Sequence, residues 1–373
     1  MLTVRPPTRD IMKVSRLLLP MILFLTWSVA GSAQTPDPYA PGKQVISDLQ
    51  HIVTAGGVQE TFTATLGGVP QVVNVRGSDR ANPILIYLHG GPGAVEMPFA
   101  WSFQRPWEDF FTVVQFDQRG AGRSYRLTDA KKVAPTMTID RYRQDAIELI
   151  ELLRERYDQQ KVFLLGHSWG SVVGLSVAAT RPDLLYAYVG IGQYIDPVAG
   201  EREGFRWTLE QARKDGNQQA VDELDALEPY PGDFAIEKID AERKWAVHYG
   251  ALFHRRADGN FYFNLARLSP DYTPEDRHAW GDGSAMSVKI VEPQLGSWEY
   301  ALIPQLDCPV VMFEGRHDYL VPSAITAHWI SSLRAPSKKI VWFENSGHMM
   351  MIEEPGRMLK ALVDEVLPLA DKR

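Results

Sequence analysis

The sequence is almost free of cysteine. Its 373 residues include only Cys308, so no disulfide can form within the chain and no cysteine cluster can hold a metal ion. Because Cys308 stands at the start of an apolar run, we expect it to be a buried packing residue. No other pattern in the sequence indicates a metal or cofactor, and we predict neither.

Long runs of basic residues are also missing. The chain has 39 Lys and Arg against 46 Asp and Glu, a net charge of −7, and lacks the basic stretches that bind nucleic acid. We therefore expect no nucleic-acid partner. With 45% hydrophobic and 23% charged residues, the composition is that of a folded protein with room for a large core and an insertion.

The apolar run near the N-terminus is too short for a typical membrane-spanning helix. Residues 17–30 fall below the ~20 residues that such a helix needs, and they include Pro20. A basic segment precedes this run and small residues follow it, which is the pattern of a signal peptide over residues 1–33. Translation starting at Met1 or at Met12 fits this pattern. We expect a secreted or periplasmic protein without a membrane span after signal removal.

After a lead-in over residues 34–59, whose Pro-rich first part we expect to be mobile, strands and helices alternate. Two β-prone runs flank Gly67-Gly68 and predict a hairpin over residues 61–75. Continuous apolar runs predict buried parallel strands, with helices between them. The predicted strands are residues 84–88, 112–116, 162–165, 184–191, 310–313 and 340–343, and the predicted helices are residues 139–157, 171–180, 324–333 and 356–366.

This alternation breaks after residue 196, where the chain becomes charged, aromatic and helix-prone. We interpret residues 197–298 as a helical cap inserted into a core of residues 60–196 and 299–373. Within the cap we expect helices over residues 202–214, 218–227 and 234–255, followed by an irregular stretch to residue 294. The fold class is predicted to be α/β, with a mostly parallel central sheet flanked by helices and the cap over the C-terminal edge of the strands.

One short motif carries the candidate chemistry. Ser168 lies in Gly166-His167-Ser168-Trp169-Gly170, between a predicted strand and a predicted helix. Glycines two residues before and after a serine let the backbone pass through a tight turn that exposes the hydroxyl, as in a nucleophile elbow. We therefore predict that Ser168 is a nucleophile.

A serine nucleophile needs a base and an acid that orients the base, and after an elbow these follow in the order Ser, Asp or Glu, His. Of nine histidines, His348 fits this order because it lies in a loop directly after the last predicted strand. The loop after the preceding strand contains Asp318, the predicted acid. Asp196, after the strand that follows the elbow, is the competing acid.

Acyl transfer also requires hydrogen-bond donors for the developing oxyanion. The backbone N–H of Trp169, directly after the nucleophile, is one predicted donor. The glycine-rich loop His89-Gly90-Gly91-Pro92-Gly93 follows the strand over residues 84–88 and supplies the second, which we assign to Gly91.

In combination, these motifs resemble the proline iminopeptidase-like branch of the α/β-hydrolases. The resemblance rests on the glycine-rich loop, on residues 117–124, on the elbow, and on the loops that carry Asp318 and His348. It implies an α/β-hydrolase fold and a serine hydrolase whose relatives often release an N-terminal residue, frequently proline, from peptides or amides. The family's oxyanion donors fall on Gly91 and Trp169. The chain departs from the family at His167, where iminopeptidases commonly carry Gly, and at Ala94-Val95-Glu96, where further glycine is common.

Cleavage beside a free N-terminus requires carboxylates that pair with the substrate's ammonium group. The candidates are Glu96, near the glycine-rich loop, and Glu201, Glu203 and Glu210 in the cap. The leading hypothesis is a secreted serine aminopeptidase of the proline iminopeptidase type that acts through an acyl-enzyme on a small molecule or short peptide. The alternatives are a carboxylesterase for small esters and a non-catalytic ligand-binding homologue.

Overall fold

The computed structural model describes residues 37–298, 300 and 302–370, and the predicted signal peptide lies outside them. An eight-stranded sheet forms the centre of the chain, in the order β1-β2-β4-β3-β5-β6-β7-β8. β1 pairs antiparallel with β2 and β2 with β4, whereas every other pairing is parallel. The mostly parallel sheet is thus confirmed. The strands are β1 (Val58–Leu66), β2 (Val69–Gly77), β3 (Ile84–Leu88), β4 (Thr112–Phe116), β5 (Val162–His167), β6 (Leu185–Ile191), β7 (Val310–Gly315) and β8 (Lys338–Phe343).

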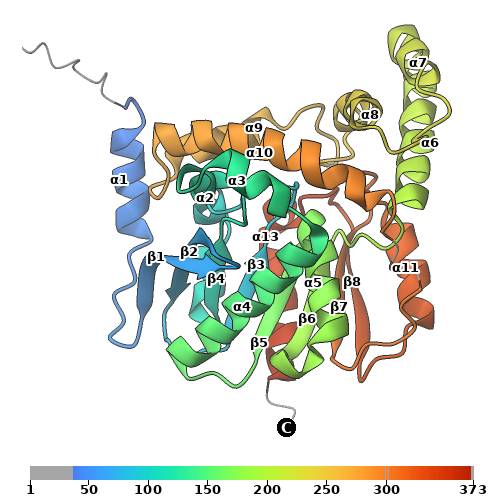
Figure 1. Cartoon of the computed structure of the whole chain (residues 1–373). Helices are drawn as coiled ribbons and strands as arrows, with labels where there is room; N and C mark the ends of the chain where they lie inside the picture. The colour runs from blue at the N-terminus through green and yellow to red at the C-terminus, as the bar shows by residue number, and fades with distance from the viewer. Residues whose placement is uncertain (1–36, 299, 301, 371–373) are drawn as a thin grey trace, which may run out of the picture. The chain divides into compact units, whose positions relative to one another are not determined.

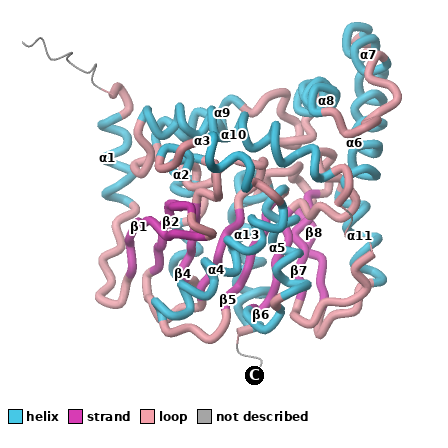
Figure 2. Tube along the Cα trace, viewed as in Figure 1, coloured by secondary structure: helices cyan, strands magenta, loops and turns pink. Residues whose placement is uncertain are grey.

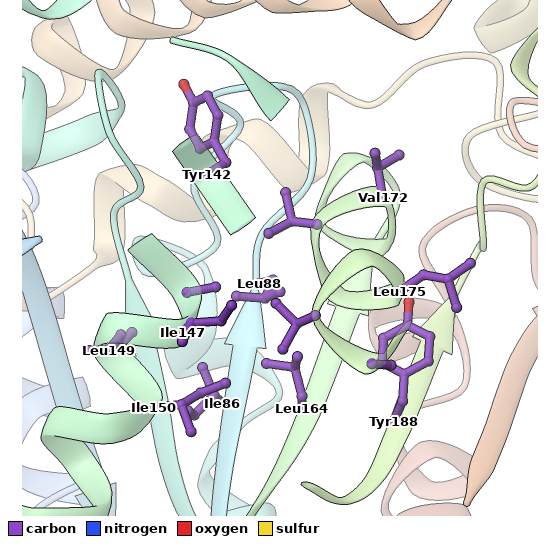
Figure 3. Close-up of a cluster of buried hydrophobic side chains, with 14 of the residues drawn as sticks. Ile86, Leu88, Tyr142, Ile147, Leu149, Ile150, Leu164, Val172, Leu175 and Tyr188 are labelled. Carbon is purple, nitrogen blue, oxygen red and sulfur yellow. The ribbon is translucent and has the colours of Figure 1, made fainter. Parts of the chain in front are cut away.

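Both faces of the sheet are covered, which explains why β3 is apolar throughout and why β4, β5 and β6 are mostly apolar. On one face, Ile86 and Leu164 pack against α4 (Ile139–Tyr157) and α5 (Trp169–Thr180), as Figure 3 shows. On the other face, the alternate residues Leu85 and Phe163 belong to a second cluster, which includes Trp107 and residues of the C-terminal helices. The sheet is therefore buried between two hydrophobic layers.

Within the described residues, five α-helices are inserted between β6 and β7. In Figures 1 and 2 they gather at the upper end of the sheet, with α10 running across it. The helices predicted within the insertion are present with shifted ends; the third ends early because the chain turns through Gly250, at a φ of +92°. These helices are α6 (Pro197–Asp215), α7 (Gln218–Asp225), α8 (Ile236–His248), α9 (Asn260–Leu265) and α10 (Pro274–Leu295).

Short helices complete the described chain, and none of its helices is long and apolar enough to cross a membrane. The predicted last helix is split into α13 and a wider helical turn over residues 362–366. The remaining α-helices are α1 (Ala40–Leu49), α2 (Gly122–Arg126), α3 (Ala130–Val133), α11 (Ser323–Ser332), α12 (Met350–Glu353) and α13 (Pro355–Ala361). Single 3₁₀ turns span Ala100–Ser102, Arg105–Asp109, Ala134–Thr136, Pro182–Leu184, Ala266–Leu268 and Leu367–Leu369.

The expectation of an irregular stretch up to residue 294 is wrong, because α10 is a 22-residue helix. Its start is encoded locally: Thr273 and Asp276 form a reciprocal capping box and Pro274 occupies the first turn. Gly283 reads as a helix breaker in the sequence, yet it allows close packing. A Cβ at this position would lie 2.6 Å from the carbonyl oxygen of Gly120.

The expectation of a mobile N-terminal lead-in is also wrong in part, because residues 40–49 form α1. Pro41 lies in the first turn of this helix, where proline's missing N–H costs no hydrogen bond. The helix is tied to the insertion, since the Lys43 ammonium group donates to the carbonyl oxygen of Tyr272 over 3.0 Å. Proline in this segment therefore begins a helix instead of preventing one.

Two glycines of α10 provide a matched test of this packing. Gly281→Ala should stabilise the protein by roughly 0.5–1 kcal/mol, because its Cβ would meet no atom within 4 Å and alanine favours helix. Gly283→Ala should instead destabilise it by roughly 1–3 kcal/mol, because backbone must move. Urea unfolding of both variants measures the difference. Equal stabilisation by the two substitutions would contradict the close contact with Gly120.

Candidate active site

Ser168 occupies a tight turn between β5 and α5. Its φ of 53° and ψ of −122° lie outside the regions that residues other than glycine usually adopt. A Cβ on Gly166 would lie 2.5 Å from the carbonyl oxygen of Gly170, and a Cβ on Gly170 would lie 2.0 Å from that of Leu88. Only glycine at both positions allows this turn, so the predicted strand-turn-helix context of the serine is present.

His348 and Asp318 meet at the same end of the sheet, in the loops after β8 and β7. The Nδ1–H of His348 donates to Oδ2 of Asp318 over 2.7 Å, and both side chains are buried. Oδ1 of Asp318 accepts the backbone N–H groups of Leu320 and Val321, at 3.0 and 2.9 Å. With its proton on Nδ1, the imidazole has a lone pair on Nε2, as a general base requires. Ser168 and His348 line one cavity.

Asp196, the competing acid, has a different role. Its side chain accepts the backbone N–H of Ala199 over 2.9 Å and caps the N-terminus of α6. The acid next to His348 is therefore Asp318.

One side chain links Trp169 to the glycine-rich loop that carries Gly91. Gln118 accepts the indole N–H of Trp169 over 3.1 Å and donates to the carbonyl oxygen of His89 over 3.0 Å. The N–H of Trp169 is at the first position of α5, where a helix offers no acceptor for it. Gly91 has a φ of +108°, and a Cβ there would lie 2.4 Å from the amide nitrogen of Ala94. This backbone conformation requires glycine.

The cavity over Ser168 measures about 210 Å³ and combines aromatic walls with a few charged groups. Phe99 stacks on Tyr262 with ring centroids 4.2 Å apart, and Trp280 contacts the edge of Phe99 at 5.4 Å. The insertion supplies Arg243 and Glu292 at this cavity, whereas Glu96 and His167 come from the core. The site is thus built jointly by the sheet and the inserted helices.

A family model, described as the alpha/beta hydrolase fold, matches residues 83–355. The chain belongs to this family. It is 30% identical over 302 residues to the probable aminopeptidase YbaC of Bacillus subtilis, with 80% of this chain and 93% of the relative covered. Identity to the proline iminopeptidase of Neisseria gonorrhoeae is 24% over 338 residues, covering 83% and 98% of the two chains.

The crystal structure of a proline iminopeptidase-related protein from Thermus thermophilus is similar in fold. Its TM-score is 0.57 at 21% identity, with 82% of this chain and 96% of that chain covered. This structure confirms the fold, and the sequence relatives show that this α/β-hydrolase is proline iminopeptidase-like. The protein is a serine hydrolase.

The four predicted substrate-binding acids of this hydrolase lie in different surroundings. Glu96 is buried, lines the cavity and accepts the hydroxyl of Tyr262 over 2.8 Å. Glu201 is buried and paired with Arg243, and it does not line the cavity. Glu203 pairs with Arg206, and the exposed Glu210 pairs with Lys214. Neither Glu203 nor Glu210 lines the cavity.

Sequence reasoning missed Glu292, an acid on α10 that lines the cavity. Burial raises the pKa of Glu292 to about 7, and the positive charge of Arg243 offsets part of this effect. Arg243 itself bonds to Glu242 at 2.7 Å and to Glu201. The capping sequence at Thr273 was the signal that would have revealed α10 and so placed Glu292 on a helix facing the core.

The raised pKa of Glu292 predicts a pH-dependent stability effect. The folded chain binds the proton of the Glu292 carboxyl group more tightly than the unfolded chain does. Protonated Glu292 therefore stabilises the fold at low pH, and this contribution is lost as the pH rises toward 7. Glu292→Gln, which imitates the neutral acid, should raise the thermal midpoint by a few degrees at pH 8 and progressively less toward pH 5. Thermal unfolding across this range measures the difference. Glu210→Gln is the control, and a pH-independent effect of Glu292→Gln would refute the shift.

Proposed function

We propose that this hydrolase removes the N-terminal residue from short peptides or aminoacyl amides, with Ser168, His348 and Asp318 as its catalytic triad. The observation that carries the proposal is the cavity itself. A serine in an elbow and a histidine bonded to a buried aspartate share this cavity with the carboxylates of Glu96 and Glu292. The first pair suits acyl transfer and the second suits a substrate with a positive charge.

The reaction proceeds in two steps. In the first, the Ser168 hydroxyl attacks the carbonyl carbon while its proton moves to Nε2 of His348. The N–H groups of Gly91 and Trp169 stabilise the oxyanion, and Asp318 stabilises the imidazolium that forms. His348 then protonates the departing amine as the C–N bond breaks, leaving an ester between the acyl group and Ser168.

In the second step, water replaces the amine. His348 takes a proton from water as the hydroxide adds to the acyl carbon, and it returns a proton to Ser168 as the ester bond breaks. The products are the free N-terminal amino acid and the shortened peptide or amine. Water in this step enters a cavity whose walls are largely apolar, which also suits an apolar side chain next to the scissile bond.

The preference for an aminoacyl substrate is supported by the charges around the cavity. Arg243 forms ion pairs with Glu201 and Glu242, and these two carboxylates offset its positive charge at the cavity. Glu96 and Glu292 add two more carboxylates at the cavity wall. The names of the relatives, a probable aminopeptidase and a proline iminopeptidase, agree with this preference.

The triad predicts the effect of removing the nucleophile. Ser168→Ala should lower kcat for an aminoacyl 4-nitroanilide by at least about a thousandfold, because triad members act as a unit. Release of 4-nitroaniline measures turnover. Ser331→Ala, on the exposed face of α11, is the matched control and should retain wild-type turnover. Turnover by Ser168→Ala close to that of the wild type would exclude Ser168 as the nucleophile.

The acidic cavity predicts that the substrate needs a free amino group. N-acetylation of prolyl or alanyl 4-nitroanilide removes the positive charge and should lower kcat/KM by at least about tenfold, the size of one charge-assisted hydrogen bond. A parallel assay with the corresponding acyl 4-nitrophenyl esters controls for intact acyl transfer. Equal cleavage of free and acetylated anilides, or hydrolysis of esters alone, would instead favour the carboxylesterase function.

A further inference from the structure

His167 has a buried nitrogen atom without a partner beside the nucleophile. It precedes Ser168 at the end of β5, and its ring lies 4.8 Å from that of His348. Nε2 of His167 is 3.3 Å from the carbonyl oxygen of His348, whereas Nδ1 forms no hydrogen bond within the described residues. Only 3% of the residue is exposed. A buried polar atom left unpaired in this way costs free energy and requires an explanation.

The contacts of His167 fix which nitrogen carries the proton. A carbonyl oxygen can only accept, so Nε2 is the donor to His348. Burial lowers the pKa of His167, which keeps the imidazole neutral. A neutral imidazole with its proton on Nε2 has a lone pair on Nδ1. Nδ1 of His167 is therefore a hydrogen-bond acceptor that lacks a donor.

The atom that faces Nδ1 is also an acceptor. Oε1 of Glu96 lies 3.7 Å from Nδ1, too far for a direct hydrogen bond. The other carboxylate oxygen of Glu96 already accepts the Tyr262 hydroxyl. Within the described chain no Lys or Arg forms an ion pair with Glu96, although its side chain is only 5% exposed. A buried carboxylate without a cation lies beside a lone pair without a donor.

We propose that Glu96 Oε1 and His167 Nδ1 form a two-acceptor site that binds the α-ammonium group of the substrate. Because the acceptors are separated by less than two hydrogen-bond lengths, one nitrogen atom can lie within reach of both. Both residues line the cavity together with Ser168. This inference rests on the proposed aminopeptidase function and assigns the recognition of its substrate to the core rather than to the inserted helices.

The position of the site favours an α-amino group over an amine farther along the substrate. A Cβ built on Gly90 would lie 3.2 Å from Cβ of Ser168 and 3.4 Å from Nδ1 of His167, so both lie around the same glycine. An α-amino nitrogen is separated from the attacked carbonyl carbon by only one carbon atom. Two acceptors also match the two N–H groups of a secondary ammonium, such as that of an N-terminal proline.

Conservative variants separate this role from general effects on the triad. Glu96→Gln keeps an acceptor for Tyr262 but removes the charge, and His167→Gln can keep a donor to His348 while removing the Nδ1 acceptor. Each should lower kcat/KM for prolyl 4-nitroanilide about 10- to 100-fold, mainly through KM. The decrease for an acyl 4-nitrophenyl ester without an amino group should be much smaller. The measured quantity is the ratio of the two kcat/KM values.

Glu210→Gln makes the same chemical change as Glu96→Gln on an exposed helix and should leave this ratio unchanged. A ratio within about threefold of wild type in either Glu96→Gln or His167→Gln would overturn the two-acceptor site, even if the wild type cleaves free aminoacyl anilides. Wild-type protein that cleaves only esters would refute the proposed function itself. The two failures are therefore distinguishable.

A substrate series on the wild-type protein gives a second test that does not depend on the folding of any variant. Alanyl, N-methylalanyl and N,N-dimethylalanyl 4-nitroanilides carry the same charge but three, two and one N–H groups. Two acceptors predict similar kcat/KM for the first two substrates and a decrease of about tenfold or more for the third. Cleavage of the dimethyl substrate as efficient as that of the monomethyl substrate would overturn the proposal.

Discussion

The close backbone contact between the start of α5 and the end of β3 sets the position of Ser168 relative to the glycine-rich loop. Gly170 approaches the carbonyl oxygen of Leu88 so closely that any Cβ there would overlap it at 2.0 Å. This contact places the turn at Ser168 beside the loop that follows β3, and that loop carries Gly91. The proposed nucleophile and the proposed oxyanion donors are therefore positioned by one packing contact between backbone atoms, which side-chain motion cannot loosen.

Electrostatics at the cavity depend on how one guanidinium group is shared. Arg243 bonds to Glu201 and Glu242, and its charge also acts on Glu292. One positive charge cannot neutralise three carboxylates in a partly buried site, so protons must balance the remainder. Burial accordingly raises the pKa values of both Glu242 and Glu292.

The sheet and the positions of Ser168, Asp318 and His348 could be predicted because each depends on local pattern and chain order. Apolar runs identify parallel strands, and parallel strands bring the loops at their C-terminal ends to one edge. The cap acids could not be chosen in this way. Glu201 and Glu203 lie two residues apart, about 200° around a helix, so they face opposite sides. The rotation of α6 is set by tertiary packing, which turns Glu201 toward Arg243 and Glu203 away from the cavity.

Helix α10 was missed for a related reason. Glycine lowers intrinsic helix propensity, but Gly283 contributes through tertiary packing, since it lets α10 approach the carbonyl oxygen of Gly120. Helix propensity alone predicts an irregular stretch here, because the packing that favours Gly283 involves Gly120, more than a hundred positions away in the sequence. Glu292 lies on α10, so the error in predicting this helix also meant that Glu292 was not predicted to line the cavity.

The residues proposed for acyl transfer all lie in the core, whereas the surroundings of Glu96, proposed for substrate recognition, include a residue of the insertion. Asp318, His348 and Ser168 are fixed by loops and turns of the core, and the inserted helices contribute no member of this proposed triad. Glu96 also belongs to the core, but Tyr262 of the insertion holds one of its carboxylate oxygens at 2.8 Å. Movement of α9 would therefore reorient Glu96 without displacing the nucleophile. Under the proposed role of Glu96 in recognition, the Tyr262–Glu96 hydrogen bond is thus the contact through which the insertion can change substrate preference while the positions of Ser168, His348 and Asp318 stay constant.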